Sequence, residues 1–137
     1  MGIVSMSKIT AQIEDIQSVE NLNIVTFVSN DIKLEMMSLE LNEKIKIGTK
    51  VLLSVKPTAV AIGKNFSGEL SYSNQIKCKI SSLEVGELLC SLQMNFNAFT
   101  LESIITTASQ KRMNLQVNDE VTALIKSSEL AIERILS

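Results

Sequence analysis

The chain has 137 residues, of which 45% are hydrophobic and 20% are charged, and its net charge is −2. This composition excludes general disorder and allows one ordinary domain or two very small ones. The sequence lacks a block of Lys or Arg, which argues against broad nucleic-acid binding, because phosphate contacts need concentrated positive charge.

The predicted elements are mostly short strands. Ile9, Ala11 and Ile13 alternate with polar residues, as a half-buried strand requires. In chain order, strands are predicted at residues 9–13, 24–28, 32–37, 51–55, 76–80, 88–94, 100–105 and 121–125, from alternation or from β-branched and apolar content. Single helical turns are predicted at residues 39–44 and 109–114. The pattern indicates an all-β protein.

The two halves of the sequence repeat each other. Residues 54–62 match residues 124–132, so Lys56 and Lys126 are equivalent and lie 70 positions apart (126 minus 56). Nearer the start of each copy the offset is 67, as between Ile9 and Ile76, so the second copy has about three extra residues before Asn118. Small and turn-forming residues at 65–69 mark the junction. We therefore predict two modules, at residues 1–66 and 67–137.

Several classes of protein are disfavoured by what the sequence lacks. It contains no histidine, which excludes Ser-His-Asp and Cys-His catalysis and histidine-bound zinc or iron. The Asp and Glu residues are scattered, so no carboxylate metal site is predicted. No apolar run approaches the roughly 18 residues of a membrane-spanning helix. We expect neither catalysis nor a membrane partner.

The cysteines and the first residues point to the cytoplasm. Cys78 and Cys90 show neither metal-ligand spacing nor the density of a secreted disulfide scaffold, and both lie in strand-like runs. Residues 1–8 lack the pattern of a secretory signal, and Met6 stands where a myristoylation signal needs Ser or Thr. We expect a cytoplasmic protein with reduced cysteines, a single disulfide being the alternative.

Three motifs in the second half resemble one family. Residues 114–128 read Asn-Leu-Gln-Val-Asn-Asp-Glu-Val-Thr-Ala-Leu-Ile-Lys-Ser-Ser. This resembles the ending of a molybdate-binding Mop module, or TOBE domain, which often reads Leu-x-x-Gly-Asp-x-Val-Thr-Ala-Leu-Ile-Lys-Ala-Ser/Thr. Residues 70–77 resemble the family's opening motif, Ser-Ala-Arg-Asn-x-Leu, and residues 105–109 resemble its Thr-x-x-Ser segment. The motifs occur in family order.

The resemblance implies two OB-like, five-stranded β-barrels in tandem, each with a short helix. It also implies a non-enzymatic protein that binds molybdate or tungstate for storage, buffering or delivery. Family sites lie where modules or subunits meet, so a homodimer or homotrimer is expected. The residues that the resemblance assigns to the oxyanion are Ser71, Ser73, Asn74, Thr106, Ser109, Lys126, Ser127 and Ser128.

The chemistry of these residues suits a tetrahedral dianion. Removing such an ion from water is costly, so many hydrogen-bond donors must converge on its four oxygens. Hydroxyl groups and amides supply donors, and Lys126 adds one mobile positive charge.

The first half departs from the motifs. Residues 4–7 keep hydroxyl groups but not the opening motif, and residues 38–42 contain no Thr-x-x-Ser. Pro57 follows Lys56 directly and has no N–H to donate. In the second half, Ser73 stands where the family commonly has Arg. We expect the first half to be mainly structural.

Two other functions remain open at this stage. The chain could be a molybdate-sensing regulatory or oligomerisation module acting on a transcription regulator or a transporter. Neither a helix-turn-helix region before Ser7 nor a phosphate-binding loop around Gly48 is recognisable. Nucleic-acid binding through an OB-like barrel is disfavoured, because one Tyr and four Phe offer few stacking platforms.

Overall fold

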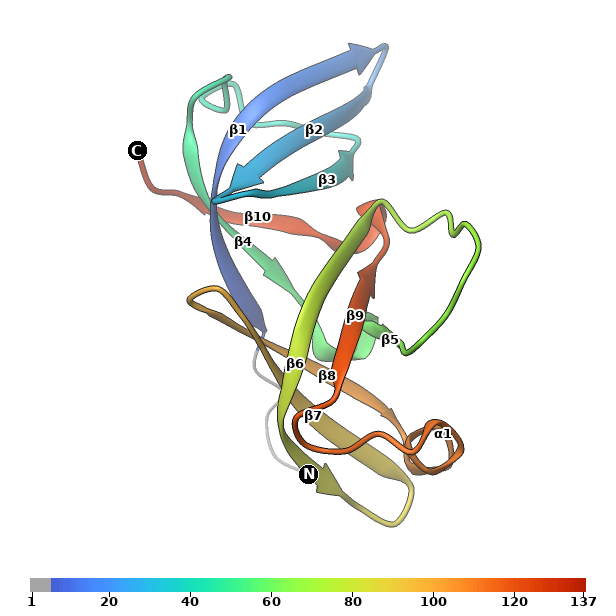
Figure 1. Ribbon diagram of the computed structural model, residues 1–137. Coiled ribbons are helices and arrows are strands. Elements are labelled where there is room, and N and C mark those ends of the chain that lie inside the picture. Colours follow the sequence, from blue (N-terminus) through green and yellow to red (C-terminus); the bar gives the residue numbers. More distant parts are fainter. Residues whose placement is uncertain (1–5) are drawn as a thin grey trace.

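The computed structural model describes residues 6–137 (Figure 1). Val4 and Ser5 of the first-half opening segment, and most of the N-terminal signal region considered above, lie outside the described residues. The elements are β1 (Ser7–Val19), β2 (Leu22–Ser29), β3 (Ile32–Ser38), β4 (Lys50–Val55), the 3-10 helix η1 (Pro57–Ala59), β5 (Ala61–Gly63), β6 (Asn74–Val85), β7 (Leu89–Phe96), β8 (Phe99–Thr106), α1 (Thr107–Met113), β9 (Glu120–Ile125), the 3-10 helix η2 (Ser127–Glu129) and β10 (Ala131–Ile135).

The strands form two five-stranded antiparallel sheets that exchange their last strands. The first sheet has the order β10-β4-β1-β2-β3 and the second has the order β5-β9-β6-β7-β8. Strand β5 belongs to the first half of the chain but pairs with β9, and β10 belongs to the second half but pairs with β4. Figure 1 shows β10, in red, lying beside the green strand β4 at the edge of the first sheet. The division at residue 66 stays a prediction about the chain, because the sheets share strands across it.

The predicted repeat is visible in the details of the two sheets. A register shift between Ile13 and Asp15 in β1 recurs between Ile80 and Ser82 in β6, at the same offset of 67. The turn before β4 contains Gly48 with φ of 93°, and the turn before β9 contains Asn118 with φ of 77°. Gly and Asn are the residues that most readily adopt this left-handed conformation. The two halves thus share the same register shift and the same left-handed turn position.

Alternating side chains produce the core. Along the first part of β1 and of β6, every second residue is buried and the residues between are exposed. Phe27, Ile76, Leu92 and other apolar residues from both halves belong to one cluster of buried side chains. Burial of this apolar surface is the main term that stabilises the sheets. Cys78 and Cys90 are free and buried, and burial raises the pKa of the Cys78 thiol to about 11.

Two polar side chains close the outer edges of the sheets. The Asn74 Oδ1 accepts from the Glu35 N–H at 2.7 Å, and its Nδ2 donates to the Glu35 carbonyl at 2.9 Å. At the equivalent place in the repeat, the Ser7 Oγ accepts from the Glu102 N–H at 2.9 Å. Glu35 and Glu102 belong to the edge strands β3 and β8, whose unpaired backbone would otherwise invite further strands. These bonds also join the two halves.

The prediction of a helix in both halves is wrong for the first half. Helix α1 begins after Thr106, whose side chain accepts from the Ser109 N–H and caps the helix. At the offset of 67 the equivalent residue is Leu39, which has no capping oxygen. Residues 39–44 instead form a turn in which the Ile45 N–H donates to the Asn42 carbonyl at 2.9 Å. The missing cap and the shorter loop explain the difference.

The predicted strands are all present, with ends shifted by a few residues. Strands β5 and β10 were not among the predictions, because each is short and depends on the other half for pairing. Among the described residues, no helix has the length and apolar character needed to span a membrane.

Candidate oxyanion-binding site

Lys126 lies where β9 gives way to η2. Its side chain is exposed, and it lines a pocket of about 410 Å³ together with Lys56, Thr58, Ala59, Tyr72 and Glu129. Ser127, half-buried, and Ser128, exposed, follow in η2. Ser128 lines a different hollow, of about 470 Å³, between β3 and β10. The Lys-Ser-Ser motif therefore surrounds one turn but points in more than one direction.

The opening motif approaches Lys126 through the segment that connects β5 to β6. Ser71 and Ser73 are exposed in this segment, and Tyr72 between them is half-buried and lines the Lys126 pocket. Asn74 is fully buried, and its Nδ2 also donates to the Ile125 carbonyl at 3.1 Å, next to Lys126. Both N–H groups of this amide are thus used within the chain. An anion contact from Asn74 stays a prediction, and the geometry favours a structural role for its side chain.

Thr106 and Ser109 lie together at the start of α1. The Thr106 Oγ1 accepts from the Ser109 N–H at 3.1 Å and donates to the Ser109 Oγ at 3.0 Å. The Arg112 guanidinium donates to the same Ser109 Oγ at 3.2 Å. Arg112 was not among the predicted site residues, since only its place one helical turn after Ser109 could have suggested it. Together the three residues form a small, partly exposed donor group.

The two groups of predicted residues lie at opposite ends of the second sheet. Figure 1 shows α1 beside the end at which β9 begins, whereas Lys126 follows the other end of β9. A six-residue strand spans roughly 20 Å. No hydrogen bond within the described residues joins Thr106 or Ser109 to Lys126 or to the opening motif. One chain alone does not place all of these donors around a single ion.

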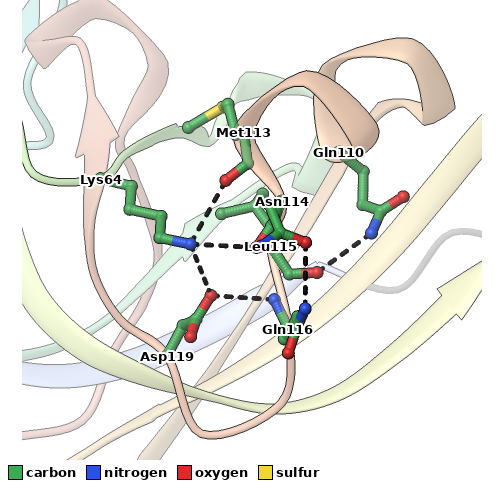
Figure 2. A network of polar contacts seen from close by, with 7 residues as sticks. All are labelled: Lys64, Gln110, Met113, Asn114, Leu115, Gln116 and Asp119. Atoms are coloured by element: carbon green, nitrogen blue, oxygen red, sulfur yellow. Dashed lines mark hydrogen bonds and ion pairs between the residues drawn. The ribbon is translucent and has the colours of Figure 1, made fainter.

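Lys64 holds the start of the connecting segment (Figure 2). Its Nζ donates to the Met113 carbonyl at 3.2 Å and to the Asn114 carbonyl at 3.0 Å, and it forms an ion pair with the Asp119 Oδ2 at 3.0 Å. The carbonyls at the end of α1 lack partners within the helix, so a lysine there both caps and complements the helix dipole. Asp119 also accepts from the Gln116 N–H at 2.9 Å. Lys64 therefore ties exchanged strand β5 to α1 and to the turn before β9.

The Lys64–Asp119 contact predicts a change of stability in acid. The hydrogen bond from Lys64, with that from the Gln116 N–H, lowers the pKa of Asp119. A carboxyl with a lowered folded-state pKa stabilises the fold above its unfolded pKa of about 3.9, and this contribution is lost as pH falls through the folded pKa. We expect the Lys64→Met variant to lose less stability than the wild type between pH 5 and pH 3.

Urea unfolding at a series of pH values measures this difference. Lys33→Met is the matched control, because Lys33 makes an exposed ion pair with Glu14 at 3.4 Å far from α1. Equal pH slopes for Lys64→Met and the wild type would contradict the assignment.

Residues 70–132 match the TOBE domain family. The matched TOBE segment runs from the opening motif through η2 and contains all eight predicted site residues. The predicted family resemblance of the second half is therefore confirmed.

The fold comparison extends to the first half as well. The structure of the cytoplasmic molybdate-binding protein ModG, in a form with molybdate bound, is similar with a TM-score of 0.88 at 19% identity, over 96% of this chain and 97% of that chain. No curated protein matches the chain. At this identity the likeness shows that the two proteins share a fold. The TOBE segment of this chain lies in the second half of that fold.

Proposed function

We propose that this protein binds molybdate or tungstate without catalysis, as a cytoplasmic store, buffer or carrier of the oxyanion. The observation that carries the proposal is the TOBE segment, since every residue predicted to contact the anion lies within it. The fold shared with a molybdate-bound protein supports it. So does the pocket that the opening motif and Lys126 line together. The two halves correspond to two Mop-like, OB-like barrels in tandem.

The proposal includes a homo-oligomer of two or three chains. The separation of the Thr106–Ser109 pair from Lys126 supports this, because a second chain can bring the missing donors to each group. Large apolar side chains are exposed at equivalent hairpin ends of both halves, at Val19 and Leu22 and at Val85, Leu88 and Leu89. Clustered exposed apolar residues of this kind are typical of contacts between proteins.

Titration calorimetry tests the binding directly. We expect molybdate and tungstate to bind at least about 100-fold more tightly than sulfate, a difference of about 2.7 kcal/mol. Ser109→Ala should weaken binding, because it removes a hydroxyl group from the donor group at α1. Thr100→Ala, which removes an exposed hydroxyl group in β8 outside the predicted site and outside the exposed apolar hairpin ends, is the control.

The oligomer is tested in the same samples by native mass spectrometry. It should show assemblies of two or three chains, with molybdate bound to the assembly. The absence of binding heat with both molybdate and tungstate would sink the proposal.

A further inference from the structure

Lys56 and Lys126 occupy the same local structure in the two halves. Each precedes a 3-10 helix, with φ and ψ of −74° and 139° at Lys56 and of −67° and 147° at Lys126. The Lys56 carbonyl accepts from the Ala59 N–H at 2.9 Å, and the Lys126 carbonyl accepts from the Glu129 N–H at 3.0 Å. The presence of Pro57 in the first half does not alter this turn.

Strand exchange brings the two lysines to one place. The chain leaves β4 through η1 and enters β5, which pairs with β9, and it leaves β9 through η2 and enters β10, which pairs with β4. The two 3-10 helices are therefore the crossing points between the sheets, and the crossings run in opposite directions. As a result both lysine side chains line the same pocket, which belongs to both halves.

The charges of this pocket suit a dianion. Two lysine ammonium groups and the carboxylate of Glu129 are the charged groups that line it, while Thr58 and Tyr72 add hydroxyl donors. The two lysine charges repel each other. A dianion between them attracts both, and these two attractions outweigh the repulsion. The pocket is open to water, so the ion keeps part of its hydration.

We propose that Lys56 and Lys126 together bind one oxyanion dianion between the two halves of a single chain. The first half is then a ligand-binding element as well as a scaffold. This proposal rests on the proposed function and specifies one of its sites. The proposal also implies that Glu129 limits the affinity, because its carboxylate repels the anion. The equivalent residue of the first half, Ala59, carries no charge.

Charge-removing variants of the full chain test the shared site by calorimetry with molybdate. We expect Lys56→Gln to weaken binding about 10-fold, comparable with Lys126→Gln, since each removes one charge-assisted contact. Glu129→Gln should tighten binding about 3-fold by removing repulsion. Lys46→Gln, at an exposed first-half lysine outside this pocket, controls for net charge and should stay within about 2-fold of the wild type.

The chain supplies its own optical probe of this pocket. Tyr72 is the single tyrosine and the sequence contains no tryptophan, so the tyrosine fluorescence reports on Tyr72 alone. Molybdate should change this fluorescence in the wild type at the concentrations at which heat is released, and Lys56→Gln should shift the change to higher concentrations. Thermal unfolding of each variant without anion shows that the fold is retained.

The outcomes separate this proposal from the proposed function. Wild-type affinity in Lys56→Gln, with weakened binding in Lys126→Gln, would overturn the shared site and leave oxyanion binding standing. Equal weakening in Lys46→Gln and Lys56→Gln would also overturn it, because the effect would then be one of net charge. Absence of molybdate binding in the wild type would overturn both.

Discussion

Replacement of Asn74 by Ala is expected to lower the free energy of unfolding by about 3 kcal/mol, because it leaves three backbone groups, one buried and two half-buried, without partners. The lost bonds join the Asn74 amide to the Glu35 N–H, the Glu35 carbonyl and the Ile125 carbonyl. Asn74 is fully buried, so water cannot replace these bonds without opening the sheet edge. Equilibrium unfolding in urea measures the loss.

Ser7→Ala is the matched control for Asn74→Ala. It acts at the equivalent edge of the other sheet but removes one bond, to the Glu102 N–H. We expect it to cost about 1 kcal/mol. Similar losses in the two variants would contradict the bridging role of the Asn74 amide. If Asn74→Ala keeps its stability but loses molybdate binding, the side chain is an anion ligand instead.

Truncation after Leu130 is expected to destabilise the first sheet, although the deleted residues belong to the second half of the chain. The deletion removes β10, whose register with β4 runs from Ala131 opposite Ser54 to Ile135 opposite Val51. It also removes the Lys8–Glu133 ion pair at 3.1 Å. Without β10, β4 becomes an edge strand, its N–H and carbonyl groups on that side lose their partners, and apolar side chains beneath are exposed.

Hydrogen exchange followed by mass spectrometry locates the effect of the truncation. Amides of β4 and of β1 should exchange at least about 100-fold faster than in the wild type, whereas β6 and β9 should be less affected. A synthetic peptide of residues 131–137 should restore part of the protection. Faster exchange confined to β9 would contradict the strand exchange.

The fold was predictable where local pattern decides the structure. Alternation in residues 9–13 and 76–80 gave the central strands, and the equivalence of Lys56 with Lys126 gave the repeat. The pairing of strands was not predictable in this way. A three-residue strand such as β5 has no sequence pattern that indicates β9 as its partner. The exchange of strands depends on contacts between residues far apart in the chain, which periodicity does not encode.

The predicted site could be found as motifs but not as an arrangement. Thr106 and Ser109 are hydrogen-bonded as the Thr-x-x-Ser spacing suggests, and Lys126 lines a pocket with Tyr72 of the opening motif. The motifs did not indicate that the Asn74 amide would form hydrogen bonds with the Glu35 backbone. Nor did they indicate that Lys56 would line the same pocket as Lys126. Both facts follow from how the two halves interlock, which depends on contacts between residues far apart in the chain.

The crossed strands set an order for folding. Strand β10 is the last strand within residues 6–137, yet the first sheet is incomplete without it. During synthesis, β1 to β4 emerge first and must wait with one edge open until the residues after η2 have been made. Pairings between such distant segments raise the contact order and slow folding. The same interlock means that neither half can unfold alone without withdrawing a strand from the other, so the two sheets should melt in one transition.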